Sequence, residues 1–142
     1  MEYISKGNVC SIFPTSKNKR LNTKVCASII KDIINAIYYL HNMNPPIIHG
    51  YIKPENVLLS DGLVAKLTDC LNNYVPDEDW GRIPIHADRV RFQYLSPEIV
   101  RGRRHYNDKG VDIWCIGVLL FMLVTNNVPF QGNDYPSITN NI

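Results

Sequence analysis

The rest of the chain is arranged around one segment, which runs His49-Gly50-Tyr51-Ile52-Lys53-Pro54-Glu55-Asn56-Val57-Leu58-Leu59. After the polar first part of the segment comes a short apolar run, Val57–Leu59, which predicts a β-strand. A second run, Val64–Leu67, follows after Ser60-Asp61-Gly62, a sequence typical of a tight turn. The two runs predict a two-stranded hairpin directly after a polar loop.

A long amphipathic helix is predicted before this segment. Asn22-Thr23 supplies short polar side chains that cap free backbone N–H groups at a helix start. Pro45-Pro46 ends the helix, because proline lacks an N–H and restricts the residue before it. Between these limits, apolar residues recur at three- and four-residue spacing and form one stripe. They are Val25, Ile29, Ile30, Ile33, Ile34, Ile37 and Leu40.

A second helix is predicted over the apolar run Ile113–Val124. The run is apolar nearly all round, as in helices that are buried within a fold. It is too short to span a bilayer, which takes about 20 apolar residues, and it contains Gly117. The expected fold class is therefore mainly α with a small β-hairpin.

The composition is that of one globular domain. The chain has 142 residues, of which 45% are hydrophobic and 20% are charged, and its net charge is +2. So small a charge does not indicate nucleic acid or an anionic membrane as a partner. The cysteines show no metal-ligand spacing, so we expect reduced thiols in a cytoplasmic protein, with disulfides or zinc as the alternatives. They are Cys10, Cys26, Cys70 and Cys115.

The segment from His49 to Leu59 resembles the catalytic loop of protein kinases, whose pattern is His-Arg-Asp-Leu-x-x-x-Asn followed by an apolar strand. His49 and Asn56 have the required separation, and Lys53-Pro54 stands in its usual place. The resemblance covers essentially residues 1–135, and its finer features are similar to the tyrosine-kinase-like branch, especially receptor-interacting and mixed-lineage-like kinases. Other similar segments are Ala36–His41 before the loop, Thr68–Leu71 at the Asp-Phe-Gly motif, Tyr94–Glu98 at Ala-Pro-Glu and Asp112–Leu120 at the central helix.

Residues 1–9, which begin Met-Glu-Tyr-Ile and include Gly7, resemble the hinge between the two kinase lobes, with Met1 at the gatekeeper position. The resemblance implies that backbone groups near Tyr3 and Ile4, together with Leu58, face an adenine ring. The Gly-rich loop, the strand-borne Lys and the helix Glu that precede the hinge in kinases are expected to be absent. We therefore expect one partial domain over residues 1–142, a truncated kinase-like C-lobe that runs from the hinge through the helix after the central buried helix, without the N-lobe.

The loop departs from the kinase pattern at its chemical centre. Tyr51 replaces the Asp that accepts the substrate proton, and a phenol with a pKa of about 10 is a poor base at neutral pH. Gly50 replaces the Arg that receives an activating phosphate. Cys70 and Leu71 replace the Phe and Gly of Asp-Phe-Gly. We expect no intact catalytic residue, with His49 in a structural role.

Other positions keep a kinase-like residue. Asp112 is expected to fix the loop backbone at His49, as the Asp at the head of the central helix does in kinases. Asn56 and Asp69 remain as two vestigial magnesium ligands. Because the phosphate-covering loop of kinases is expected to be absent, we expect no cofactor, with weak Mg·ATP binding as the alternative.

The segment from Asp69 to Glu98 corresponds to the kinase activation segment. It has no Ser or Thr before Ser96, so Tyr74 and Tyr94 carry the remaining hydroxyl groups. Together with the missing Arg of the loop, this argues against a phosphorylation switch. The basic run Arg101–His105 is interpreted as a solvated turn, with an acidic partner as the alternative.

These features favour a catalytically dead, kinase-like (pseudokinase) module that is not an enzyme and binds another protein, such as a kinase or signalling protein. No nucleic acid or membrane is expected as a partner. Two alternatives stay open. One is a Ser/Thr protein kinase with ATP binding whose N-lobe is missing from this chain. The other is a non-functional remnant of a kinase gene, which predicts an unstable product with uncovered apolar surface.

Overall fold

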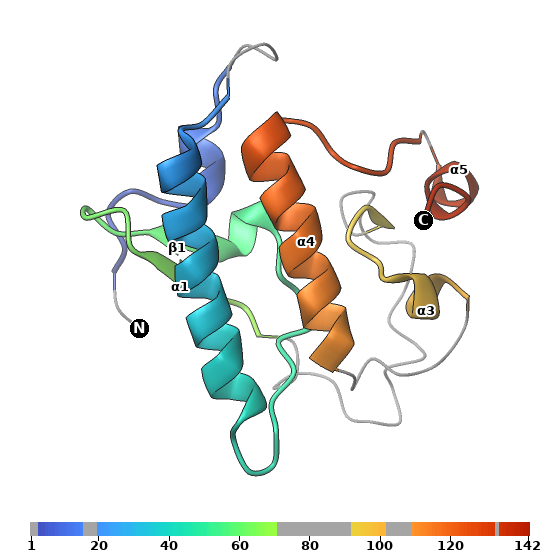
Figure 1. Cartoon of the computed structure of the whole chain (residues 1–142), viewed down its shortest axis with the longest axis horizontal. Coiled ribbons are helices and arrows are strands. Elements are labelled where there is room, and N and C mark those ends of the chain that lie inside the picture. The colour runs from blue at the N-terminus through green and yellow to red at the C-terminus, as the bar shows by residue number, and fades with distance from the viewer. Residues whose placement is uncertain (1–2, 16–19, 71–91, 102–108, 133) are drawn as a thin grey trace.

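The computed structural model describes residues 3–15, 20–70, 92–101, 109–132 and 134–142. Two long helices, α1 (Thr23–His41) and α4 (Lys109–Thr125), pack side by side (Figure 1). The short helices α3 (Pro97–Val100) and α5 (Tyr135–Thr139) lie on the side of α4 away from α1 in Figure 1. Single 3-10 turns cover Val9–Ile12 and Pro54–Asn56. The expected fold class, mainly α with a small hairpin, is confirmed.

Helix α1 begins and packs largely as its sequence predicts. The side chain of Asn22 caps the helix by accepting the backbone N–H of Lys24 at 2.8 Å. The helix ends at His41, a few residues before the predicted proline stop. Ile34 does not belong to the buried stripe, because it lies at the edge of the apolar face and is 49% exposed. The buried apolar residues are Cys26, Ile29, Ile30, Ile33 and Ile37.

The predicted hairpin forms and is tied to α1. Strand β1 (Val57–Leu59) pairs antiparallel with β2 (Ala65–Leu67), which begins one residue later than the predicted run. The backbone N–H of Ala65 donates to the carboxylate of Asp32 on α1 at 3.0 Å. This bond and the packing of β2 on α1 set the position of the loop that precedes β1.

Helix α4 has one buried face and one exposed apolar face. The predicted helix is confirmed. It is not buried on all sides in the described structure, because the packing with α1 covers only one of its faces. Ile113 is 59% exposed, Leu120 40% and Phe121 42%. No helix in the described ranges combines the length and the apolar character that a bilayer crossing requires. The buried residues of α4 are Val111, Asp112, Cys115, Ile116, Val118, Leu119 and Leu123.

A second, smaller apolar cluster joins α3 to α5. Its buried members are Phe92, Leu95 and Ile138. Phe130, which follows α4, packs both here and against the main core. The short helices are therefore connected to the two long ones through the segment after α4.

Candidate functional site

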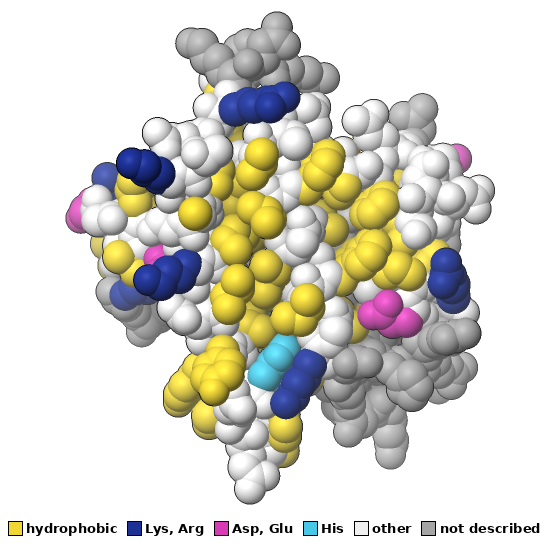
Figure 2. All heavy atoms as spheres, viewed as in Figure 1, with side chains coloured by type: hydrophobic (Ala, Val, Ile, Leu, Met, Phe, Trp, Pro, Cys, Tyr) yellow, Lys and Arg dark blue, Asp and Glu magenta, His cyan; other side chains and the backbone are white. Residues whose placement is uncertain are grey.

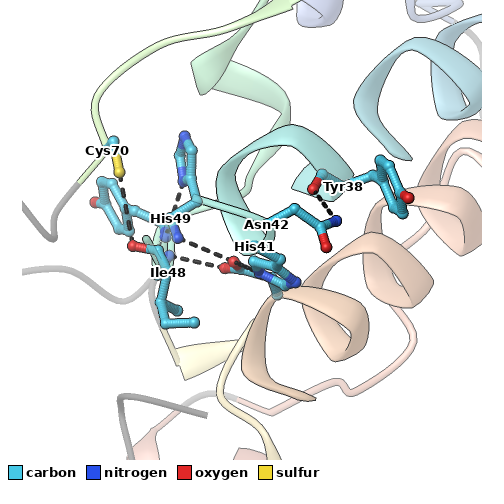
Figure 3. A network of polar contacts seen from close by, with 9 residues as sticks. Tyr38, His41, Asn42, Ile48, His49 and Cys70 are labelled. Carbon is cyan, nitrogen blue, oxygen red and sulfur yellow. Dashed lines mark hydrogen bonds and ion pairs between the residues drawn. The ribbon is translucent and has the colours of Figure 1, made fainter. Parts of the chain in front are cut away.

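A buried carboxylate at the head of α4 holds the loop His49–Asn56, called loop 49–56 below. Asp112 is 0% exposed, and its Oδ1 accepts the N–H of Gly50 at 2.8 Å. Its Oδ2 accepts the N–H of His49 at 2.9 Å and lies 2.7 Å from Nε2 of His41 (Figure 3). These partners offset the cost of burying the charge. The predicted role of Asp112 in fixing the loop at His49 is confirmed.

His41 is a site residue that the sequence analysis missed. It is the last residue of α1, is 8% exposed, and joins the end of α1 to the head of α4 through Asp112. A histidine in the last turn of a helix also interacts favourably with the carbonyl groups there. The signal for this contact in the sequence was weak, because it consisted of a histidine at a predicted helix end and an aspartate at the start of another helix.

Both ring nitrogens of His49 are occupied. Nδ1 accepts the backbone N–H of Tyr51 at 3.2 Å, so the ring proton lies on Nε2, which donates to the carbonyl oxygen of Thr68 at 3.1 Å. Burial lowers the pKa of His49 and outweighs the opposing effects of the Asp112 carboxylate and the Thr68 hydrogen bond. The neutral ring joins the loop to the strand end after β2, which supports a structural role.

Tyr51 is paired with Lys53 within loop 49–56. The Lys53 ammonium Nζ donates to the Tyr51 phenol oxygen at 2.7 Å. The same ammonium lies 4.2 Å from the centroid of the Tyr51 ring, which adds a cation–π attraction. The phenol oxygen therefore receives a hydrogen bond from a cation at the position where kinases have a carboxylate.

Little space remains on one side of Tyr51. A cavity of about 20 Å³ lies there, which is room for about one water molecule. Lys53 is the one charged group among its lining residues, which include Tyr94 and Cys115. Burial raises the pKa of Cys115 to about 12 and also raises the pKa of Tyr94. No carboxylate among the lining residues replaces the missing Asp.

The strand pairing brings Asn56 and Asp69 to the same end of the hairpin. The backbone N–H of Thr68 donates to the carbonyl of Asn56 at 3.0 Å, and Asp69 is the next residue. Asn56 is buried, and its Nδ2 donates to the carbonyl of Tyr51 at 2.9 Å, which leaves Oδ1 as an acceptor. Asp69 has a backbone φ of 61°. The structure describes no group of three or more His, Cys, Asp or Glu residues arranged to hold a metal.

The predicted hinge segment lies against β1. The carbonyl of Gly7 accepts the N–H of Leu59 at 2.8 Å, and Asn8 forms an antiparallel bridge with Leu58. Tyr3 is 88% exposed, whereas Ile4 is half-buried, and Leu58 is half-buried beside the bridge. The structure thus places the segment that follows Tyr3 and Ile4 beside Leu58.

Cys70 lines a groove of about 450 Å³ between α1 and the end of β2, together with Tyr39 and Leu40 of α1. Its Sγ lies 3.6 Å from the carbonyl oxygen of Ile48 (Figure 3). The cysteines at all four positions in the sequence are free thiols in the structure, as expected.

Several predictions lie outside the described residues. They concern the gatekeeper Met1, Leu71 and Tyr74 in the activation segment, and the basic run beyond Arg101. Arg101 itself follows α3 and is exposed.

The similarity to known proteins extends over the whole chain. The family described as "Protein kinase domain" matches residues 1–142. NUAK family SNF1-like kinase 1 of Homo sapiens is 33% identical over 147 residues, covering 100% of this chain and 20% of the relative. Aurora kinase B of Mus musculus is 33% identical over 142 residues, covering 95% of this chain and 36% of the relative. The chain thus spans little more than a third of these relatives' length at most.

A solved structure supports the same fold. The crystal structure of Rad53 1-466 in complex with AMP-PNP matches with a TM-score of 0.75 and 24% identity, covering 99% of this chain and 33% of that chain. These relatives do not test the finer placement in the tyrosine-kinase-like branch, which stays a prediction. From the family match, the relatives and the fold, we conclude that the chain belongs to the protein kinase family.

Proposed function

We propose that this chain is a pseudokinase module that does not transfer phosphate and acts by binding another protein. In this proposal it corresponds to the kinase C-lobe, from the hinge through the helix after α4. The α-rich fold, the hairpin after loop 49–56 and the anchoring of that loop by Asp112 support the assignment.

The observation that carries the proposal is the pairing of Tyr51 with Lys53. A base must accept the proton of the substrate hydroxyl, and the phenol oxygen already accepts a hydrogen bond from the Lys53 ammonium at 2.7 Å. Tyr51 is therefore unsuited to replace the catalytic carboxylate.

The expected loss of rate is large. Removing a general base costs about 10²–10⁴-fold, which corresponds to about 3–5 kcal/mol of activation free energy. The glycine at position 50 adds to this loss, because it cannot receive an activating phosphate as an arginine would. Together the two substitutions oppose the alternative of an active Ser/Thr kinase.

Residual nucleotide binding is a separate question. Asn56 Oδ1 and the Asp69 carboxylate are oxygen ligands of the kind that Mg²⁺ accepts, and they lie at the same end of the hairpin. In this fit, Asn56 and Asp69 would hold the ion, and Leu58 would contact the adenine. A bound Mg²⁺ would supply charge neutralisation for phosphate oxygens. With two protein ligands, we expect at most weak Mg·ATP binding.

The proposed partner is another protein, such as a kinase or signalling protein, within the cytoplasm. The net charge of +2 supports neither nucleic acid nor an anionic membrane. The exposed apolar face of α4 supports protein binding, because large exposed apolar patches mark interaction surfaces.

Two measurements test the proposal. Purified protein incubated with radiolabelled Mg·ATP and protein substrates should transfer no more label than an Asp69→Ala variant, and faster transfer would overturn it. Thermal unfolding should be cooperative and should shift little on addition of Mg·ATP. A non-cooperative melt would instead support the gene remnant, and a large Mg-dependent rise in melting temperature would support an ATP-binding protein.

A further inference from the structure

A long basic stretch of the sequence leads into α1. Residues 3–31 contain six Lys and Arg residues and no Asp or Glu. The six are Lys6, Lys17, Lys19, Arg20, Lys24 and Lys31. Figure 2 shows Lys and Arg side chains exposed around the start of α1, in the upper left of the view. A partner that approaches this stretch therefore meets positive charge, and acidic groups on the partner are attracted to it.

One hydroxyl group in this stretch stands at a fixed distance from an arginine. Arg20 precedes Thr23 by three residues, and no other Ser or Thr of the sequence has a basic residue three positions before it. Lys17 and Lys19 precede the same arginine. Kinases select substrates partly through charge patterns of this kind, and a guanidinium group pairs with two carboxylate oxygens at once. The pattern distinguishes Thr23 from the other hydroxyl residues.

The structure presents both residues at the surface. Arg20 and Thr23 are exposed, and Arg20 lies outside α1. The Thr23 hydroxyl makes no hydrogen bond with any residue that the structure describes. Asn22, directly before it, has an extended backbone with a φ of −63° and a ψ of 130°. The hydroxyl therefore stands at the end of an extended segment, the form in which a groove takes up a peptide.

Only the first turn of α1 has to open for a kinase to reach Thr23. The N–H of Lys24 donates to the Asn22 side chain at 2.8 Å, and the N–H of Cys26 donates to the Asn22 carbonyl at 3.1 Å. Helix ends open locally at a small cost in free energy. The first buried residue of α1 is Cys26, so the core stays packed while the helix start opens.

We propose that Thr23 is a phosphorylation site for a separate Ser/Thr protein kinase that has an acidic substrate groove and recognises Arg20. In the reaction, Oγ1 of Thr23 forms a bond to the γ-phosphorus of Mg·ATP, and the bond from that phosphorus to the β–γ bridging oxygen breaks, so that ADP leaves. The hydroxyl proton passes to the catalytic carboxylate of the kinase. The inference goes beyond the proposed function, because it makes this chain the substrate of another kinase.

The attached phosphate would have favourable surroundings. It adds a charge of about −1.5 to −2 at neutral pH, close in sequence to Arg20 and Lys24. The first turn of α1 contains no acidic residue, so the phosphate meets the N–H groups of the helix start without repulsion from a carboxylate there. Phosphorylation should therefore stabilise the start of α1 and reduce the positive charge of the stretch before it.

Phosphorylation in vitro tests the proposal with a defined probe. The purified protein is incubated with radiolabelled Mg·ATP and an arginine-directed Ser/Thr kinase, and the labelled residue is identified by mass spectrometry. We expect one phosphate, on Thr23, and no label without the added kinase. Thr23→Ala should abolish the labelling, whereas Thr23→Ser, which keeps a hydroxyl, should retain it. A kinase that prefers acidic substrates should leave Thr23 unlabelled.

Matched variants separate recognition of Arg20 from general effects of charge. Arg20→Gln should lower kcat/KM of the added kinase by at least about tenfold, because it removes the ion pair with the groove. Lys24→Gln removes the same charge on the other side of Thr23 and should change kcat/KM by less than about threefold. Ser28 is an exposed hydroxyl of α1 with Val25 three positions before it, and Ser28→Ala should leave the labelling unchanged.

The phosphorylated protein also tests where the phosphate lies. Its melting temperature should exceed that of the unmodified protein by about 2–4 °C, because an anion at a helix start is favourable. An unchanged or lower melting temperature would overturn the placement of the phosphate at the start of α1.

Each other outcome overturns the proposal. Label on other residues alone, or label on Thr23 that Arg20→Gln leaves unchanged, would show that the basic stretch is not a recognition segment. The complete natural polypeptide has to be labelled on Thr23 as well, and protection there would show that the rest of the protein covers the site. Label on Thr23 without the added kinase would assign the transfer to this chain and would contradict the proposed function too. Failure of the added kinase to label Thr23 would leave the proposed function standing, so the two claims fail separately.

Discussion

Two parts of loop 49–56, its start at His49 and Gly50 and the pair Tyr51–Lys53, differ in what their residues contact. At the first end, the backbone N–H groups of His49 and Gly50 donate to a fully buried carboxylate, which is also bonded to His41. Directly after Gly50, Tyr51 contacts Lys53 through its phenol and the lysine ammonium group. The start of the loop is held by groups from three separate parts of the chain, whereas the bond between the phenol and the ammonium joins residues two positions apart.

This difference separates the residues that hold the loop in place from the residue at the position of proton transfer. Two of the anchoring residues, His49 and Asp112, keep the residue types that the kinase resemblance implies, and they are hydrogen-bonded to each other. The position that would perform proton transfer carries a side chain of different chemistry. The proposed function is therefore that the loop stays in place while phosphoryl transfer is lost.

The largest effect is expected at the anchored end. Asp112→Ala removes the acceptor of two backbone N–H groups and of the His41 ring, so all three are left unpaired in the interior. Each buried donor that is left without an acceptor costs about 1–3 kcal/mol, so we expect urea unfolding to show a loss of at least about 3 kcal/mol. Asp112→Asn, which keeps one acceptor oxygen, should lose less. A loss under about 1 kcal/mol for Asp112→Ala would show that the anchor is unimportant.

A smaller effect is expected from the backbone of the loop. Gly50 has a φ of 71°, in the left-handed region, where a side chain costs about 1–2 kcal/mol. Gly50→Ala should lower the free energy of unfolding by about that amount. Gly117→Ala is the control, since it lies in a helix with open space and should stabilise the protein by up to about 1 kcal/mol. Equal effects of the two changes on the free energy of unfolding would contradict the left-handed backbone conformation of Gly50.

The anchored end should also respond to pH through His49. Burial lowers the pKa of His49 below its usual 6.5, so the folded protein binds fewer protons there than the unfolded chain. The stability that the neutral ring contributes is present above about pH 6.5 and is lost as the pH falls below it. Unfolding free energies measured from pH 7.5 to pH 5 should therefore fall more steeply for the natural protein than for His49→Gln. Parallel curves would argue against a buried neutral ring.

The smallest effect is expected at the local pair. Tyr51→Phe keeps the ring under the Lys53 ammonium and removes the phenol oxygen that accepts its hydrogen bond. A single partly exposed bond of this kind contributes under about 1 kcal/mol, so urea unfolding should change little. A loss as large as that of Asp112→Ala would mean that the Tyr51–Lys53 pair also stabilises the fold. The proposed difference between this pair and the anchored start of the loop would then be wrong.

The sequence predicted those features that depend on local patterns. The stripe from Ile29 to Ile37, the cap at Asn22 and the hairpin after Asn56 follow from spacing and turn chemistry, and the structure has all three. The contact between His41 and Asp112 joins residues 71 positions apart, and no periodicity reports such a pair.

Helix α4 shows why other features could not be predicted. A helix that is apolar nearly all round predicts burial on every side, but the pattern does not state which neighbours are present. The Tyr51–Lys53 contact depends on the irregular backbone of loop 49–56, where neither helical nor strand spacing applies. The exposed face of α4 and the hydrogen bond of the Tyr51 phenol could therefore be recognised only in the structure.

The most direct test of the central claim is a phosphoryl-transfer assay on three forms of the purified protein. The natural protein, Tyr51→Phe and Asp69→Ala are incubated with radiolabelled Mg·ATP and a protein substrate, and the transferred label is counted. The account predicts the same background level for all three, since position 51 carries a phenol in place of the carboxylate that accepts the substrate proton. Transfer that Asp69→Ala abolishes and Tyr51→Phe leaves unchanged would contradict it.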